Sequence, residues 1–173
     1  RLPQGIDFDQ LEAIFKSGKI KFFYTIPRYH YPLGHSYSKQ EKEQILALAD
    51  LYDVYIVEDD YLGDYDPHFS PSFHYLDASD RVIYIKSFST SLFSALRITS
   101  MVLPQALLFP VLKLKGTLDY ESNLVMQKAL SLYIDNGMFA KNKGLLHQQQ
   151  VIQKEQTASL LQQHSLSVPV WPV

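Results

Sequence analysis

Residues 81–104 read RVIYIKSFSTSLFSALRITSMVLP, and this stretch joins two apolar segments through a turn rich in hydroxyl groups. The segments RVIYIKSF and RITSMVLP have many apolar and β-branched residues, which favours strands, and Pro104 ends the second one. Four hydroxyl residues lie in the turn between them: Ser87, Ser89, Thr90 and Ser91. Arg97 follows a few residues later. Hydroxyl groups beside a guanidinium suit an oxyanion, so we expect this turn to bind a phosphate.

Two further strands are expected before this stretch, at KIKFFYTI (19–26) and VYIVE (54–58). The second is apolar almost throughout, as is typical of a parallel sheet covered on both faces. Between them, Ser38 begins an S-x-x-E capping box, which predicts the start of a helix. A shorter helix is expected from Asp9, as its cap, to about Ser17. Strands and helices in this order predict an α/β domain with a mostly parallel sheet.

The pattern changes to a helical one after this sheet. Residues 119–164 carry apolar side chains at helical spacing, with Gly137 between two expected helices. The last residues, SLSVPVWPV (165–173), have the pattern of a strand that starts another sheet. We therefore expect residues 1–115 to be part of a large α/β domain. Residues 116–173 would form a helical connection and the start of a small domain.

Composition excludes several classes of function for these 173 residues. The net charge is -2, without the basic patch that a nucleic-acid-binding module usually carries. The absence of cysteine excludes disulfides and thiolate chemistry, and a reducing, cytoplasmic location is expected. No apolar stretch reaches the roughly 18 to 20 residues that span a bilayer. The first residue is not methionine and the start does not read as a signal peptide, so a longer parent protein is expected.

Three polar clusters each follow an expected strand. They are the loop PRYHYPLG (27–34), the acidic segment VEDDYLGDY (57–65) and the serine-rich turn (87–91). In an open α/β sheet, ligands bind beyond the carboxyl ends of the strands. One crevice is therefore expected to hold all three.

These clusters, in this order, resemble the fold-type-I pyridoxal-phosphate (PLP) aminotransferases. They resemble more closely the aminotransferase-like effector domain of MocR/GabR-type transcription regulators of the GntR family. That family has a strand leading into EDDYD and a later one leading into SFSKSLxPxLRIGY, where this chain has VYIVEDDYLGDY and YIKSFSTSLFSALRI. The similarity runs from about Lys19 to Pro104 and continues weakly to about Gln163.

The resemblance implies part of the large PLP-transferase domain, followed by long helices that lead into a small C-terminal domain. It also implies a homodimer, an amino acid or PLP as effector, and DNA contact only through a domain outside this chain. The upstream phosphate-binding helix start, the aromatic residue that stacks on the cofactor ring and the arginine near the end of the small domain are not recognisable in these residues.

The resemblance also assigns cofactor contacts residue by residue. Asp59 matches the carboxylate that faces the pyridine nitrogen and keeps it protonated, so that the ring acts as an electron sink. Tyr61 matches the phenol that hydrogen-bonds the ring hydroxyl. Ser87 and Ser89 match hydroxyls on the phosphate side. Arg97 matches the guanidinium that pairs with the phosphate.

Other matched positions depart from the family or have a less defined role. His30 and Tyr31 fall where relatives hold a polar or aromatic residue near a cofactor oxygen. Thr90 stands at the Schiff-base lysine position, since SFSK has become SFST, and a hydroxyl can neither form an imine nor act as the amine base. Lys86 lies four strand residues away, about 13 Å, and is a poor substitute. Thr99 replaces the glycine usual after LRI.

Two functions follow from this resemblance. The first is the aminotransferase-like domain of a MocR/GabR-type regulator without covalent PLP chemistry, with the cofactor bound non-covalently or absent. The alternative is a catalytic PLP-dependent aminotransferase whose lysine has been lost or mutated in this chain. A Mg²⁺ or Ca²⁺ site is a weaker interpretation of the acidic segment, and an unrelated α/β binding domain requires the match to be accidental. No metal is expected. The carboxylates of that segment are Glu58, Asp59, Asp60 and Asp64.

Overall fold

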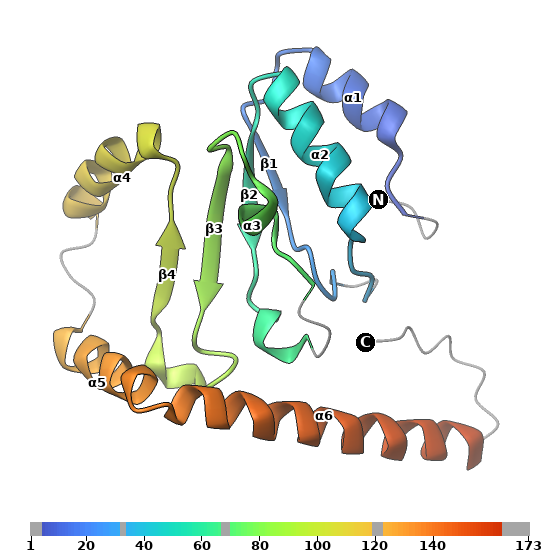
Figure 1. Ribbon diagram of the computed structural model, residues 1–173, viewed down its shortest axis with the longest axis vertical. Coiled ribbons are helices and arrows are strands. Elements are labelled where there is room, and N and C mark those ends of the chain that lie inside the picture. Colours follow the sequence, from blue (N-terminus) through green and yellow to red (C-terminus); the bar gives the residue numbers. More distant parts are fainter. Residues whose placement is uncertain (1–4, 32–33, 67–69, 119–122, 164–173) are drawn as a thin grey trace.

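The computed structural model describes residues 5–31, 34–66, 70–118 and 123–163 (Figure 1). Its elements follow in chain order: α1 (Phe8–Lys16), β1 (Phe22–Thr25), α2 (Lys39–Leu51), β2 (Tyr55–Asp59), the 3₁₀ turn η1 (Gly63–Tyr65), α3 (Phe73–Leu76), β3 (Val82–Ser87), the 3₁₀ turn η2 (Ser94–Leu96), β4 (Thr99–Val102), α4 (Gln105–Leu118), α5 (Leu124–Asp135) and α6 (Met138–Gln163). No helix among the described residues is both long and apolar enough to cross a membrane.

The four strands form one sheet in the order β1-β2-β3-β4. Strands β1, β2 and β3 are parallel, whereas β4 runs antiparallel to β3. Asp59 is level with Ile85 and Ser87 is level with Thr99, so β2 and β3 end at the edge where β4 begins. The predicted α/β class with a mostly parallel sheet is confirmed.

The main core lies where α1, α2 and α3 meet β2 and β3. Phe15, Ile45 and Phe73 are fully buried there and come from the three helices, while Ile56 and Val82 come from the two strands. A second, smaller core lies between the turn after β3, η2, α5 and α6. Figure 1 shows α6 running across the edge of the sheet at which β3 ends. The second core therefore packs beside the predicted site.

Several predicted boundaries differ from the structure. The cap of α1 is Asp7, whose Oδ1 accepts the Gln10 amide at 2.9 Å, so the predicted cap at Asp9 was wrong by two residues. Helix α4 was not predicted, because it contains Pro110 and presents no buried residue. The expected domain boundary at residue 115 falls near the end of α4 and stays a prediction. The strand expected at 165–173 lies outside the described residues.

The capping box at the start of α2 is confirmed. The Ser38 hydroxyl accepts the Glu41 amide at 3.2 Å, and the Glu41 carboxylate accepts the Ser38 amide at 2.7 Å. We expect Ser38→Ala to lower the free energy of unfolding by about 1 kcal/mol, because one helix amide loses its acceptor. Urea denaturation measures the loss, and Ser159→Ala, at an exposed serine inside α6, is the control. Equal stability of the two variants would contradict this role for the cap.

Candidate functional site

The acidic segment and the serine-rich turn meet at the edge where β2 and β3 end. The Asp60 amide donates to the Ile85 carbonyl at 2.9 Å and continues the sheet pairing beyond β2. The Thr90 hydroxyl donates to the Tyr61 carbonyl at 2.7 Å. In return, the Tyr65 hydroxyl donates to the Thr90 carbonyl at 2.8 Å. Two of the three predicted clusters are therefore joined by direct hydrogen bonds on both sides of Thr90.

The loop after β1 brings the third cluster to the same place. Tyr29, in a left-handed conformation with φ of 51°, places its hydroxyl 3.4 Å from the Tyr65 carbonyl. The His30 amide donates to the His35 carbonyl at 2.9 Å, which closes the loop on itself. The Tyr31 side chain is 76% exposed. The structure thus places the loop against the acidic segment, with the Tyr31 ring in solvent.

Asp59 is half-buried at the end of β2 and has a partner that the sequence did not reveal. The Tyr24 hydroxyl, from β1, donates to Asp59 Oδ2 at 2.7 Å. Burial and this carboxylate raise the pKa of Tyr24 to about 12, so the phenol stays a donor at neutral pH. Among the described residues, no hydrogen bond reaches the other oxygen, Oδ1. Asp59 is therefore oriented by one donor and can accept a second one.

The four carboxylates of the acidic segment point to different partners. Each has its own donor: the Phe73 and His74 amides for Glu58, Tyr24 for Asp59, Arg28 for Asp60 and Lys86 for Asp64. Carboxylates that bind one cation would converge on it. Within the described residues, no cluster of three or more histidines and carboxylates has a metal-binding arrangement. The structure therefore gives no support to the Mg²⁺ or Ca²⁺ interpretation.

A buried arginine, Arg28, forms ion pairs with the acidic segment and with Asp66, just after it. Arg28 is 7% exposed and forms ion pairs with Asp60 and, at 3.1 Å, with Asp66. It also donates to the Ser70 carbonyl. The Tyr84 hydroxyl donates to Asp60 at 3.0 Å, and burial together with this carboxylate raises the pKa of Tyr84. Sequence reasoning missed Arg28, because its partners lie more than thirty residues away.

Lys86 is turned toward the acidic segment. Its Nζ donates to Asp64 Oδ2 at 2.7 Å, and Lys143 of α6 lies 3.4 Å from Oδ1 of the same carboxylate. Burial alone would raise the pKa of Asp64, but the hydrogen bond and charge of Lys86 hold it below its ordinary value. The Lys86 ammonium therefore forms an ion pair with Asp64.

The serine-rich turn presents a mixture of engaged and accessible groups. The Ser87 hydroxyl accepts the Ser89 amide at 3.3 Å, and Ser91 is buried. Arg97 follows η2 in a left-handed conformation with φ of 52°, and its side chain is exposed. It forms no ion pair with any residue in the described ranges. The guanidinium is therefore available to an anion from solution.

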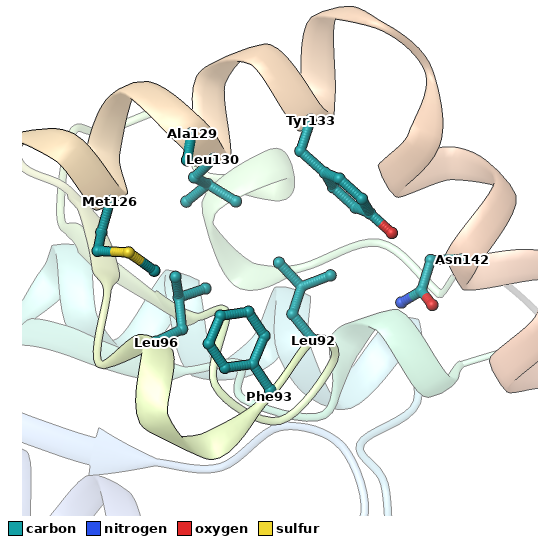
Figure 2. A pocket seen from close by; sticks show the side chains of 8 residues that line it. All are labelled: Leu92, Phe93, Leu96, Met126, Ala129, Leu130, Tyr133 and Asn142. Carbon is teal, nitrogen blue, oxygen red and sulfur yellow. The ribbon is translucent and has the colours of Figure 1, made fainter.

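An apolar pocket of about 260 Å³ opens beside this turn, between η2, α5 and α6 (Figure 2). Eight residues line it: Leu92, Phe93, Leu96, Met126, Ala129, Leu130, Tyr133 and Asn142. Figure 2 shows the hydroxyl of Tyr133 and the amide of Asn142 at one end and carbon atoms elsewhere. The sequence did not predict this pocket, because its walls come from segments that only the fold brings together.

Comparison with known proteins identifies sequence relatives of this chain. No protein-family model matches the chain. It is 43% identical over 145 residues to the uncharacterized HTH-type transcriptional regulator YcxD of Bacillus subtilis, covering 83% of this chain and 32% of the relative. It is 31% identical over 122 residues to the probable rhizopine catabolism regulatory protein MocR of Rhizobium meliloti, covering 69% of this chain and 25% of the relative.

The structural comparison agrees with the sequence comparison. A crystal structure of Pyrococcus horikoshii kynurenine aminotransferase superposes with a TM-score of 0.84 and 26% identity, over 93% of this chain and 42% of that one. The chain belongs to the fold-type-I aminotransferase-like family, near the MocR-type regulators. It spans between a quarter and a third of the length of the two regulators.

Pyridoxal phosphate is the cofactor of this aminotransferase-like family, and part of its donor set fits the groups present here. Asp59 Oδ1 can accept a pyridinium N–H, and the exposed Arg97 suits a phosphate dianion. Covalent attachment of the cofactor through an imine needs an amine. At the matched position Thr90 offers a hydroxyl, which is already bonded to the Tyr61 carbonyl. The site therefore suits non-covalent contacts with the ring nitrogen and the phosphate.

Proposed function

We propose that this chain is the aminotransferase-like domain of a MocR-type transcription regulator and that it forms no covalent bond to PLP. Support for the regulator comes from the similarity to YcxD and MocR. In the whole protein, a separate domain outside this chain would contact DNA, and the cytoplasmic regulator would act as a homodimer. An amino acid or PLP would be the effector.

The proposal that this chain forms no covalent bond to PLP rests on Thr90. PLP, when bound, supplies an electron sink that activates an amino group for transfer. An enzyme of this kind also needs an amine that bonds the cofactor's aldehyde and moves protons. Thr90 has no amine, and the nearby Lys86 is paired with Asp64 at 2.7 Å. A threonine can position a ligand, but it cannot perform either step.

The remaining contacts would bind and orient a phosphorylated ligand. Asp59, held by the Tyr24 hydroxyl, would accept a proton-bearing ring nitrogen, while Tyr61 would donate to the ring hydroxyl. Ser87, Ser89 and Arg97 would hold the phosphate. His30 and Tyr31 would lie near a ligand oxygen, although the Tyr31 ring in this structure is exposed. The proposed domain would therefore sense its ligand rather than transform it.

Borohydride trapping tests this proposal directly. Added PLP, followed by borohydride reduction and peptide mass spectrometry of the intact protein, should give no pyridoxyl label concentrated at a single lysine. Thr90→Lys should give such a label at residue 90, because a lysine held at the site has a high effective concentration. Ser94→Lys, at an exposed residue of η2 to which no cofactor contact is assigned, is the matched control and should remain near background.

Three outcomes separate the alternatives. A stoichiometric label at Lys86 in the unaltered protein would show that another amine serves the site and would favour the catalytic aminotransferase. A folded Thr90→Lys variant without label at saturating PLP would overturn the matched geometry. Adding Arg97→Ala to Thr90→Lys should reduce the labelled fraction at limiting PLP. An unchanged fraction would contradict the phosphate role of Arg97.

A further inference from the structure

We infer that α6 positions all three segments of the site at once, and that Asp64 is the central positioning residue of this contact. This inference does not rest on cofactor binding. The residues of α6 that make the contact have helical spacing: Phe139, Asn142, Lys143, His147 and Gln150. Steps of three and four residues place side chains on one face of a helix, so α6 presents one continuous stripe.

The first part of the stripe holds the serine-rich turn. The Phe139 ring lies edge-on against the Phe88 ring, with centroids 5.8 Å apart. One turn further along, the Asn142 side-chain amide donates to the Ser91 carbonyl at 2.7 Å. Ser91 follows Thr90 directly, so α6 contacts the turn on both sides of the proposed ligand position.

The middle of the stripe holds the acidic segment through Asp64. The Asp64 side chain is 4% exposed, and its two oxygens face Lys143 at 3.4 Å and Lys86 at 2.7 Å. The His147 ring nitrogen Nε2 donates to the Asp64 carbonyl at 2.8 Å. One buried carboxylate thus links β3, η1 and α6. Removing it would leave two ammonium groups facing each other in a poorly solvated place.

The last part of the stripe reaches the loop after β1. The half-buried Gln150 side chain lies near the Tyr29 hydroxyl, close enough to act on its pKa against the larger raising effect of burial. The same hydroxyl approaches the Tyr65 carbonyl at 3.4 Å. Tyr29 directly precedes His30, the first of the two matched residues in that loop. The stripe therefore touches the serine-rich turn, the acidic segment and the loop in succession.

The packing of α6 makes these polar contacts decisive. None of the described side chains of α6 is fully buried, and Phe139 is only partly buried against the second core, so α6 has less apolar packing than α2. A helix with little buried apolar area gains little from packing, and its position depends on its few specific contacts. A change that loosens α6 at Asp64 should therefore reach the loop at Tyr29, although the two residues come from different segments.

Hydrogen exchange of the intact protein tests the inference. Lys143→Met should raise amide exchange about tenfold in residues 60–66, 87–92 and 28–31, the scale expected for the loss of one charge-assisted contact. Lys143→Arg should restore slow exchange, because the charge returns. Lys141→Met, on the opposite and exposed face of α6, is the matched control and should change nothing in these segments. The strands β2 and β3 should stay protected in every variant.

The exchange rate in residues 28–31 shows whether α6 positions the whole site or whether Lys143 and Asp64 form only a local ion pair. Faster exchange limited to residues 60–66 would show that the Lys143–Asp64 pair acts only on its own turn, and would overturn the inference. A uniform increase that includes β2 and β3 would indicate global destabilisation and would overturn it as well. Asp64→Asn provides a second variant, for which the same three segments should respond together.

Discussion

Arg28→Met is expected to lower the free energy of unfolding by about 3–5 kcal/mol, the loss typical of breaking a buried ion pair on one side. The Arg28 side chain is 9% exposed, and those of Asp60 and Asp66 are 5% and 9% exposed. Methionine fills a similar volume but removes the guanidinium charge from beside two buried carboxylates. The Ser70 carbonyl loses its donor too. Most of the expected loss is the cost of keeping these carboxylates buried without the guanidinium charge.

Chemical denaturation of the variant and the unaltered protein measures this effect. Arg81→Met is the matched control, because Arg81 pairs with Asp53, whose side chain is 66% exposed. Water screens such a pair, so the control should lose much less stability. Equal losses for the two arginines would contradict the buried network.

A second comparison separates charge from packing. The triple variant Arg28→Met, Asp60→Asn and Asp66→Asn replaces all three charged members of these ion pairs with neutral side chains. It should recover a substantial part of the stability lost in Arg28→Met, because neutral amides are less costly to bury than carboxylates. A triple variant that is less stable than Arg28→Met would show that the loss came from packing. The arginine would then be a space-filling residue rather than a counter-charge.

The sequence predicted the parts of this fold that depend on neighbours along the chain. The capping box at Ser38 involves residues three apart, and the strand segments alternate or are continuously apolar over a few residues. Such patterns involve only residues that are close in the sequence, so they predict the local backbone structure directly. Helix α4 escaped prediction for the same reason, because Pro110 and the absence of a buried face remove the local signal. The cap of α1 was misplaced because Asp7 and Asp9 have the same chemistry.

The sequence predicted which polar clusters meet at the site, but not the individual partners of their side chains. The rule that ligands bind beyond the carboxyl ends of parallel strands brought Asp59 and the serine-rich turn to one edge, and the hydrogen bond between Thr90 and Tyr61 confirms that these segments meet. Tyr24 and Arg28 could not be found, since their partners depend on strand register and on a loop path. The roles matched to Ser87, Ser89 and Arg97 stay predictions.

Glu58 is expected to make the protein less stable as the pH rises from about 4.5 to about 7. Its side chain is fully buried at the end of β2 and accepts the Phe73 and His74 amides at 2.9 Å. Burial raises the pKa of Glu58 from 4.5 to about 7, although these two amides act in the opposite direction. The folded protein therefore binds a proton that the unfolded chain releases within this range.

The sign and size follow from proton linkage. Stability falls with pH wherever the folded state binds more protons than the unfolded state, by about 1.4 kcal/mol per pH unit for one proton. Over this range the loss amounts to about 3 kcal/mol. The neighbouring Lys42 does not mask it. Burial lowers the pKa of Lys42 to about 8, so this ammonium is protonated in both states throughout the range.

Urea denaturation at several pH values between 4.5 and 7 tests this prediction through Glu58→Gln. The variant has lower absolute stability at acidic pH, because an amide accepts only one of the two backbone donors. Its stability should nevertheless fall less steeply with pH, so that the two curves converge as the pH rises. Glu43→Gln, on the exposed face of α2, should run parallel to the unaltered protein. If the Glu58→Gln curve is parallel as well, the carboxyl is ionised in the folded state throughout. The two amides and the nearby Arg28 would then outweigh burial in setting its charge.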